Sequence, residues 1–147
     1  MKRPTPPVYV WTAFGAMLAA HFLVPIRQIL SFPWTLWGAV PLLVGAALAA
    51  YALRIFRRHR TTPTPFGRPH RLVTSGPFRF SRNPMYLGIL LMLSGVAGLL
   101  GTATPWLVIP ALGALFAVFF IRQEEKQLEI TFKDAYRRYC SRVRRWL

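Results

Sequence analysis

The sequence predicts an all-α integral membrane protein with four transmembrane helices, a long cytoplasmic loop between helices two and three, and a C-terminal amphipathic helix. Hydrophobic residues make up 54% of its 147 residues and charged residues only 16%, whereas a soluble domain carries about a quarter charged residues. Long stretches carry no formal charge, and the 19 Lys and Arg residues cluster between them. The length suits a single domain, which we expect to span residues 1–147.

The first two transmembrane helices are predicted over residues 8–26 and 34–56. The first charge-free stretch ends at Arg27 and the second ends at Arg54. Each stretch meets the length of roughly 20 apolar residues that a helix needs to cross the hydrocarbon core of a bilayer. The basic residues that precede the first stretch are separated from it by three prolines, so we expect a retained helix and not a cleaved signal peptide.

The next charge-free stretch, residues 83–121, is too long for one span. A single helix of this length would measure about 58 Å, nearly twice the thickness of the bilayer core. The segment Gly101-Thr102-Ala103-Thr104-Pro105 contains the Gly and Pro that interrupt helices. We therefore predict a hairpin of two helices, over residues 85–101 and 105–121.

Small and polar residues within these spans are expected to serve packing. Glycines such as Gly15, Gly45, Gly95 and Gly98 allow membrane helices to approach closely. His21 lies in the middle of the first predicted helix. It either hydrogen-bonds within the bundle or contacts the substrate, and we favour the structural role.

The distribution of basic residues predicts the orientation in the membrane. With four spans, the N-terminus, the second loop and the tail lie on one side, and they hold 18 of the 19 Lys and Arg residues. The positive-inside rule makes this side cytoplasmic, so both termini are expected in the cytoplasm. Basic residues placed between apolar spans indicate contact with membrane lipids and argue against a nucleic-acid partner. The scattered histidines and the lone cysteine lack the spacing of metal ligands, so we expect no metal.

The tail is predicted to form one amphipathic helix over residues 122–145. Its apolar residues recur at spacings of three and four, as on one face of a helix; they are Leu128, Phe132, Tyr136, Tyr139, Val143 and Trp146. Such a helix can lie along an anionic membrane surface or pack over the second loop as a lid. Both interpretations are open.

The second loop, about residues 54–84, combines prolines with aromatic residues that alternate with arginines. Loops longer than about 12–15 residues without secondary structure are usually functional or disordered, and the stiff prolines favour function. In the predicted topology this loop faces the start of the tail, Arg122-Gln123-Glu124-Glu125. Two interpretations of the adjacent acids are open. They form a salt bridge that orients the tail against the loop, or they bind the ammonium group or ribose hydroxyls of a ligand.

The loop and the tail also carry a resemblance. The segment from His70 to Gly88 reads HRLVTSGPFRFSRNPMYLG, and Glu124-Glu125 with the periodic apolar tail follows after the predicted hairpin. These two blocks resemble the signature of the isoprenylcysteine carboxyl methyltransferase and phospholipid methyltransferase families, and they cover about half of the chain. The resemblance implies a membrane methyltransferase that uses S-adenosylmethionine on the cytoplasmic side and takes a lipophilic substrate from the bilayer.

The resemblance also implies the site residues by motif position. Those expected to bind the cofactor are His70, Arg71, Leu72, Val73, Phe78, Asn83, Pro84, Met85, Tyr86 and Glu124. Among them, Phe78 is expected to pack against the adenosine. Arg122 and Glu125 are expected to orient the substrate, and no catalytic residue is assigned.

The chain departs from these families at two positions. Asn83 stands where the families usually have histidine, and Phe120 stands where isoprenylcysteine enzymes place an arginine near the substrate carboxylate. A prenylcysteine carboxylate is therefore not the expected substrate. Two other classes stay open: an NADPH-dependent membrane reductase of the sterol-reductase type, and a non-catalytic membrane protein that retains the fold.

Overall fold

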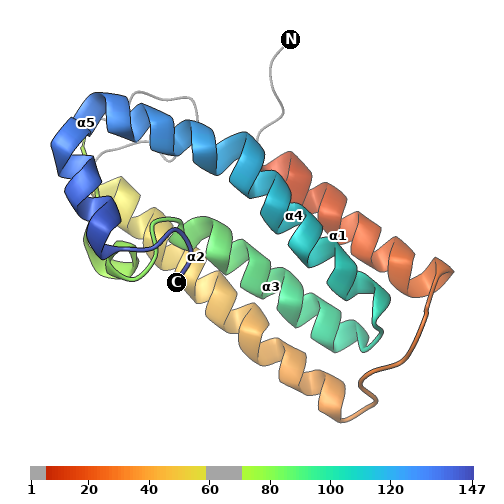
Figure 1. Ribbon diagram of the computed structural model, residues 1–147. Coiled ribbons are helices and arrows are strands. Elements are labelled where there is room, and N and C mark those ends of the chain that lie inside the picture. Colours follow the sequence, from red (N-terminus) through yellow and green to blue (C-terminus); the bar gives the residue numbers. More distant parts are fainter. Residues whose placement is uncertain (1–5, 59–70) are drawn as a thin grey trace.

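The computed structural model describes residues 6–58 and 71–147, and these residues form a helical bundle (Figure 1). The predicted all-α class is confirmed for this part of the chain. In chain order the elements are α1 (Pro6–Leu23), the 3-10 turn η1 (Trp34–Gly38), α2 (Ala39–Arg58), the 3-10 turn η2 (Gly76–Arg79), α3 (Pro84–Leu100), the 3-10 turn η3 (Thr104–Leu107), α4 (Val108–Leu115), the π-helical turn η4 (Phe116–Ile121) and α5 (Arg122–Arg142).

The helices follow the predicted order, with small differences at their ends. The prediction that the first helix extends to residue 26 is wrong, because α1 ends at Leu23. Val24 precedes Pro25, and a residue before proline is driven out of the helical conformation. α3 ends at Leu100, and the next residue, Gly101, has the left-handed φ of 74° that glycine adopts readily. The hairpin predicted around this glycine is present.

Glycines bring α2 and α3 into backbone contact. A methyl group added at Gly45 would lie 2.6 Å from the backbone nitrogen of Met92 in α3, and one at Gly95 would lie 2.6 Å from the Cβ atom of Leu42 in α2. α1 and α4 contact each other and α3. The predicted packing role is thus confirmed for Gly45 and Gly95. It is wrong for Gly15, because no atom of residues 6–58 or 71–147 lies within 4 Å of a methyl group added there.

The connector after α1 is tied to the turn between α3 and η3. The Thr104 hydroxyl donates to the carbonyl oxygen of Val24 at 2.6 Å, and the amide nitrogen of Ile29 donates to the carbonyl oxygen of Gly101 at 2.8 Å. His21 Nδ1 lies 2.8 Å from the hydroxyl oxygen of Thr102, within hydrogen-bonding distance. The predicted structural role of His21 is confirmed.

Large apolar side chains face outward over much of the bundle, among them Trp11, Phe22 and Leu43. Two helices in the described part of the chain, Trp34–Arg58 and Thr104–Arg142, are long and apolar enough to cross a membrane. Only 17% and 33% of their most apolar windows are buried, unlike the core helix of a soluble protein. In the longer helix the apolar part ends at Ile121, where the charged α5 begins. That α1 and the shorter α3 also span the membrane stays a prediction.

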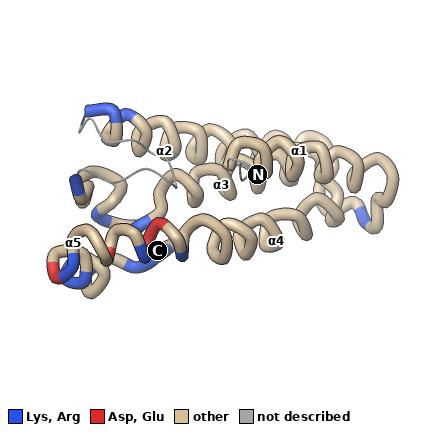
Figure 2. The backbone as a smooth tube through the Cα atoms, turned by 90° about the horizontal axis from the view of Figure 1, so that it is seen from above, with Lys and Arg blue, Asp and Glu red and all other residues tan. Residues whose placement is uncertain are grey.

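Charged residues gather at one end of the bundle, where α2 ends and α5 lies (Figure 2). We call this the basic end, and it comprises the loop segment 71–83, the first turn of α3, α5 and the C-terminal segment 143–147. At the opposite end, among the described residues, Arg27 is the one Lys or Arg.

The tail differs from the single helix that was predicted. Lys133 has φ 44° and ψ −117°, which bends α5 (Figure 1). The part after the bend packs over the loop, as the lid interpretation predicted, through a cluster of Tyr136, Tyr139 and Val143 with Leu72. The prediction that this helix extends to residue 145 is wrong, because α5 ends at Arg142 and the last residues are held by hydrogen bonds to the loop.

Candidate active site at the basic end

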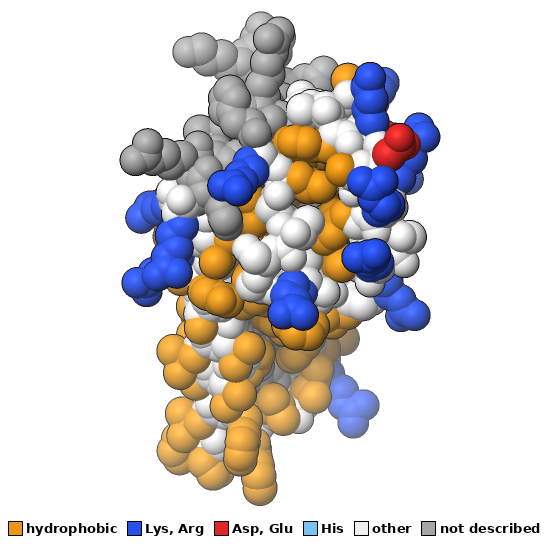
Figure 3. All heavy atoms as spheres, turned by 90° about the vertical axis from the view of Figure 1, so that its left-hand side faces the viewer, with side chains coloured by type: hydrophobic (Ala, Val, Ile, Leu, Met, Phe, Trp, Pro, Cys, Tyr) orange, Lys and Arg blue, Asp and Glu red, His pale blue; other side chains and the backbone are white. Residues whose placement is uncertain are grey.

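The loop and the tail meet at the basic end, as the sequence predicted. The Tyr139 hydroxyl donates to the carbonyl oxygen of Phe78 at 2.7 Å, and the amide nitrogen of Arg82 donates to the carbonyl oxygen of Arg144 at 3.0 Å. Segments separated by some 60 residues are therefore joined directly. In the space-filling view of this end, apolar side chains occupy the middle of the face and Lys and Arg surround them (Figure 3).

Asn83 fixes the start of α3. Pro84 occupies the first turn, where its locked φ suits a helix start, and Asn83 precedes it in a non-helical conformation. The Asn83 side-chain amide donates to the carbonyl oxygen of Arg145 at 3.0 Å, and its backbone nitrogen donates to the Ser81 hydroxyl at 3.1 Å. Asn83 is buried, so these bonds hold the first turn of α3 in place.

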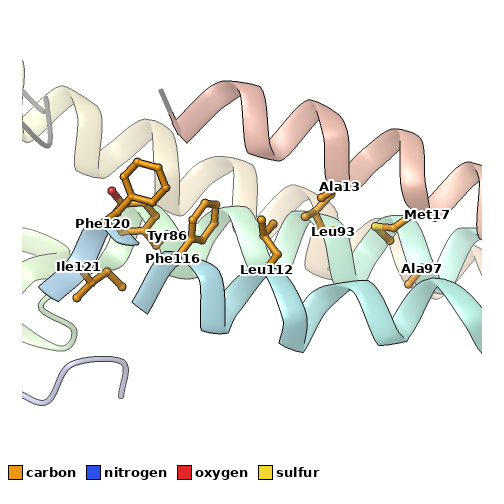
Figure 4. Close-up of a cluster of buried hydrophobic side chains, with 9 residues drawn as sticks. All are labelled: Ala13, Met17, Tyr86, Leu93, Ala97, Leu112, Phe116, Phe120 and Ile121. Atoms are coloured by element: carbon orange, nitrogen blue, oxygen red, sulfur yellow. The ribbon is translucent and has the colours of Figure 1, made fainter. Parts of the chain in front are cut away.

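Tyr86 on this first turn contacts the start of α5. Its hydroxyl donates to Oε1 of Glu124 at 2.7 Å. Its ring packs against Phe116, with ring centroids 4.9 Å apart, and against Phe120 (Figure 4). Both phenylalanines belong to the π-helical turn η4, a type of turn that occurs frequently at functional sites.

Glu124 lies beyond the apolar segment that ends at Ile121, yet it is largely enclosed by protein. Burial raises the pKa of Glu124 to about 7; the Tyr86 hydrogen bond acts in the lowering direction, and the charge of Glu125 raises it further. Among the described residues, no Lys, Arg or His side chain forms an ion pair with Glu124. A largely buried acid without a cation is costly, and it suits a site that receives a ligand's donors or positive charge.

Glu125 is engaged differently. Arg145 binds it with two parallel hydrogen bonds, from Nε at 3.1 Å and from Nη2 at 2.6 Å, and Nη1 of Arg82 lies 3.3 Å from Oε1. The hydrogen bond to Glu125 raises the pKa of Arg145. Of the two open interpretations of the adjacent acids, the salt bridge is confirmed for Glu125. The ligand contact of Glu124 stays a prediction.

A pocket of about 250 Å³ opens beside this ion pair. Nη1 of Arg82 lies 2.6 Å from Sγ of Cys140 and 3.5 Å from the Tyr136 hydroxyl. The residues that line the pocket are Arg82, Glu125, Glu129, Tyr136, Arg137 and Cys140. Sequence reasoning missed Arg82, Tyr136 and Cys140 as neighbours, although the spacing of four between Tyr136 and Cys140 places them on one helix face.

The remaining predicted site residues lie around this centre. His70 falls outside the described residues. Arg71 and Arg122 are exposed, and Leu72 packs against the tail cluster. Met85 is partly buried.

Val73 and Phe78 face α2. Both are buried in one cluster with Ala52 and Ile55, and the Phe78 ring packs edge-on against Phe56 with ring centroids 5.0 Å apart. These contacts fix the loop on α2. The predicted contact of Phe78 with adenosine stays a prediction.

The fold and the site define a helical membrane protein with a polar site at the basic end of its bundle, built from the loop before α3 and from α5. A family model described as phospholipid methyltransferase matches residues 34–135, and the chain belongs to this family. The family lies in the isoprenylcysteine carboxyl methyltransferase-like superfamily, so the resemblance noted in the sequence is confirmed at that level. It implies a methyltransferase that acts on lipids.

The match extends to a short bacterial relative. An uncharacterized protein of Haemophilus influenzae is 43% identical over 63 residues, which are 43% of this chain and 100% of that protein. No solved structure shows a significant match. The two apolar helices and the family together indicate a membrane protein.

Proposed function

We propose that the protein transfers a methyl group from S-adenosylmethionine to a lipophilic substrate at the cytoplasmic membrane face, with four transmembrane helices and both termini in the cytoplasm. The observation that carries this proposal is Glu124. Its carboxylate is largely buried, accepts a hydrogen bond from Tyr86 and has no cationic partner among the described residues. A carboxylate in this state suits the ammonium group or the ribose hydroxyls of the cofactor.

The residues at the basic end fit this cofactor. Glu124 would accept its polar donors, Tyr86 would hold the carboxylate in place, and Asn83 would keep the first turn of α3 beside it. Arg71 and Leu72 of the loop segment, together with His70, are proposed to cover the adenosine. The cofactor supplies a methyl group already activated on its sulfonium, so the hard chemistry is the cofactor's. The chain has to bind and orient both molecules and exclude water.

We propose that the apolar cluster beside Tyr86 forms the substrate side of the site. Phe116 and Phe120 pack with Tyr86 at the end of the bundle, and Tyr9 of α1 packs edge-on against Phe120 with ring centroids 5.4 Å apart. These aromatic side chains carry no positive charge that could pair with a carboxylate. This supports a substrate other than a prenylcysteine, which has a free carboxylate. Exposed Arg122, at the boundary between the apolar segment and α5, is proposed to orient the polar group of a lipid substrate.

The test uses the purified full-length protein in detergent micelles. Calorimetry with S-adenosylhomocysteine should show binding, and NADPH should show none. Incubation with cofactor radiolabelled in the methyl group and a total lipid extract should place the label in a lipid. The variant Glu124→Gln should lose binding by at least about tenfold, since a neutral amide cannot replace a charged acceptor.

Asp134→Asn is the matched control, because Asp134 is an acid of the same helix whose side chain is 79% exposed and pairs with Arg137. It should bind the cofactor product like the wild type. Binding of NADPH instead of S-adenosylhomocysteine would establish the reductase class. Cofactor binding without any labelled lipid would favour the non-catalytic class, and either result would refute the proposal.

A further inference from the structure

We propose that the C-terminal segment 143–147 is a clasp for the site and that Arg145 and Glu125 are positioning residues. This inference rests on the proposed function and replaces the expected substrate contact of Glu125. The clasp consists of segment 143–147 together with the ion pair between Arg145 and Glu125. It joins the two helix ends that carry Tyr86 and Glu124.

One residue of the clasp holds both helix ends. The guanidinium group of Arg145 binds both carboxylate oxygens of Glu125 at 3.1 Å and 2.6 Å, and this carboxylate directly follows Glu124 on α5. The carbonyl oxygen of the same Arg145 accepts the Asn83 amide at 3.0 Å, three residues before Tyr86 on α3. Arg145, which lies outside both helices, therefore supports the relative position of Tyr86 and Glu124 in addition to the direct hydrogen bond between them.

Further contacts make the clasp rigid. The Ser81 hydroxyl also donates to the carbonyl oxygen of Arg145, at 3.4 Å, and the amide of Arg82 donates to the neighbouring carbonyl oxygen of Arg144. Trp146 packs against the main hydrophobic core and Val143 against the tail cluster, so apolar contacts anchor the segment on both sides of Arg145.

The acid of the clasp is shielded from solvent, whereas its arginine is more open. The side chain of Glu125 is 16% exposed and that of Arg145 is 39% exposed; the second partner of Glu125, Arg82, is 17% exposed. Partly buried ion pairs are weakened much less by salt than surface pairs are, and the bidentate arrangement fixes the orientation of both groups. Arg82 alone cannot replace Arg145. It contacts Glu125 through one nitrogen at 3.3 Å, and the Asn83 side-chain amide donates to the carbonyl oxygen of Arg145.

A positioning role has a defined consequence for methyl transfer. The reacting atoms must be held in line, and a misplacement of about 1 Å far from the chemistry can reduce a rate about a hundredfold. Removing the Arg145 side chain should therefore weaken cofactor binding and slow turnover. The apolar bundle should remain folded, since its main core contacts lie elsewhere.

The experiment compares Arg145→Ala with Arg144→Ala in the full-length protein. Both remove one positive charge and leave the backbone carbonyl groups in place, but the Arg144 side chain is exposed. Arg145→Ala should raise the Kd of S-adenosylhomocysteine about tenfold, whereas Arg144→Ala should change it less than twofold. Arg145→Lys should restore binding in part, because it keeps the charge and loses the two parallel hydrogen bonds.

A double variant identifies the partner. If Arg145 acts through Glu125, then Glu125→Gln combined with Arg145→Ala should be no weaker in binding than Arg145→Ala alone. Additive losses would contradict the clasp. Equal Kd values for Arg145→Ala and Arg144→Ala would overturn it as well.

Amide hydrogen exchange separates this inference from the proposed function. Without any ligand, the peptide that contains Arg82 should exchange faster in Arg145→Ala than in Arg144→Ala. The reason is that the hydrogen bond from the Arg82 amide to the carbonyl oxygen of Arg144 is weakened when the clasp is loosened. A wild-type protein that binds no S-adenosylhomocysteine would refute the methyltransferase proposal. The amide exchange rates of the two variants would still test the clasp independently of the cofactor. Equal rates for the Arg82 peptide would refute it.

Discussion

The pKa of Glu124 should rise when the Tyr86 hydroxyl is removed. The substitution Tyr86→Phe keeps the ring that packs on Phe116 and Phe120, so the burial of Glu124 is retained. It deletes the hydrogen bond of 2.7 Å that stabilises the charged carboxylate. Without this bond the protonated acid is favoured, and the pKa must move upward.

The size of the shift follows from the strength of such a bond. A hydrogen bond to a charged group contributes about 1.5–3 kcal/mol, and one pKa unit corresponds to about 1.4 kcal/mol. The pKa of Glu124 should therefore rise from about 7 by about one to two units.

Infrared spectroscopy during a pH titration measures this pKa directly. The carboxylic acid band of Glu124 is assigned by its absence in Glu124→Gln, and its midpoint is compared between the wild type and Tyr86→Phe. An unchanged or lower midpoint would show that the Tyr86 hydroxyl does not stabilise the charged form, and the geometry of the site would be refuted.

The same pKa determines how cofactor binding and stability depend on pH. With a pKa of about 7, the charged fraction of Glu124 rises about tenfold between pH 6 and pH 8, so the affinity for S-adenosylhomocysteine should rise by up to about tenfold. The rise should be absent in Glu124→Gln. Without cofactor, the folding stability depends on pH in the opposite direction: it falls as the pH rises. The pKa of Glu124 in the folded protein lies above its ordinary value of 4.5, so stability due to the protonated acid is present below pH 4.5 and is lost as the pH rises through about 7.

Two substitutions test the packing that positions the site. Gly45→Ala should lower the unfolding free energy in detergent by about 1–3 kcal/mol, because the methyl group would meet backbone atoms of α3, whereas Gly113→Ala meets only a side chain at 3.5 Å and should be tolerated. Equal melting temperatures for the two would contradict the close approach of α2 and α3. Lys133→Gly should raise stability by about 1 kcal/mol, because it relieves a positive φ, while Lys126→Gly within the regular helix should cost about as much. A loss of stability in Lys133→Gly would show that α5 is straight.

Much of the fold was predictable because membrane helices obey strong constraints on length and charge. Runs without a charged residue predicted the helices, and the Gly101 turn predicted the hairpin. The bend at Lys133 was not predictable, since lysine has no preference for a positive φ. The bend is maintained by the contacts of Tyr136 and Tyr139 with the loop, which a periodic pattern does not show.

The segments that form the site were predictable from the sequence, but the contacts of the individual residues were not. The sequence predicted that the loop and the start of the tail meet, and this is confirmed by the contacts between Arg82 and Glu125. It did not predict the partner of each acid. Arg145 lies in the last three residues of the chain, in a segment that was expected to be helical, so its return to Asn83 was missed.

The different roles of Glu124 and Glu125 follow from helix geometry. Adjacent residues on an α-helix point about 100° apart, so two neighbouring carboxylates cannot serve the same partner. Glu125 turns toward Arg82 and Arg145, and Glu124 turns toward Tyr86. In a chain with a net charge of +15, pairing one acid with two arginines still leaves the other acid without a cation among the described residues. Glu125 therefore cannot substitute for Glu124 in Glu124→Gln, because its carboxylate is turned away from Tyr86 and is held by its ion pairs with Arg82 and Arg145.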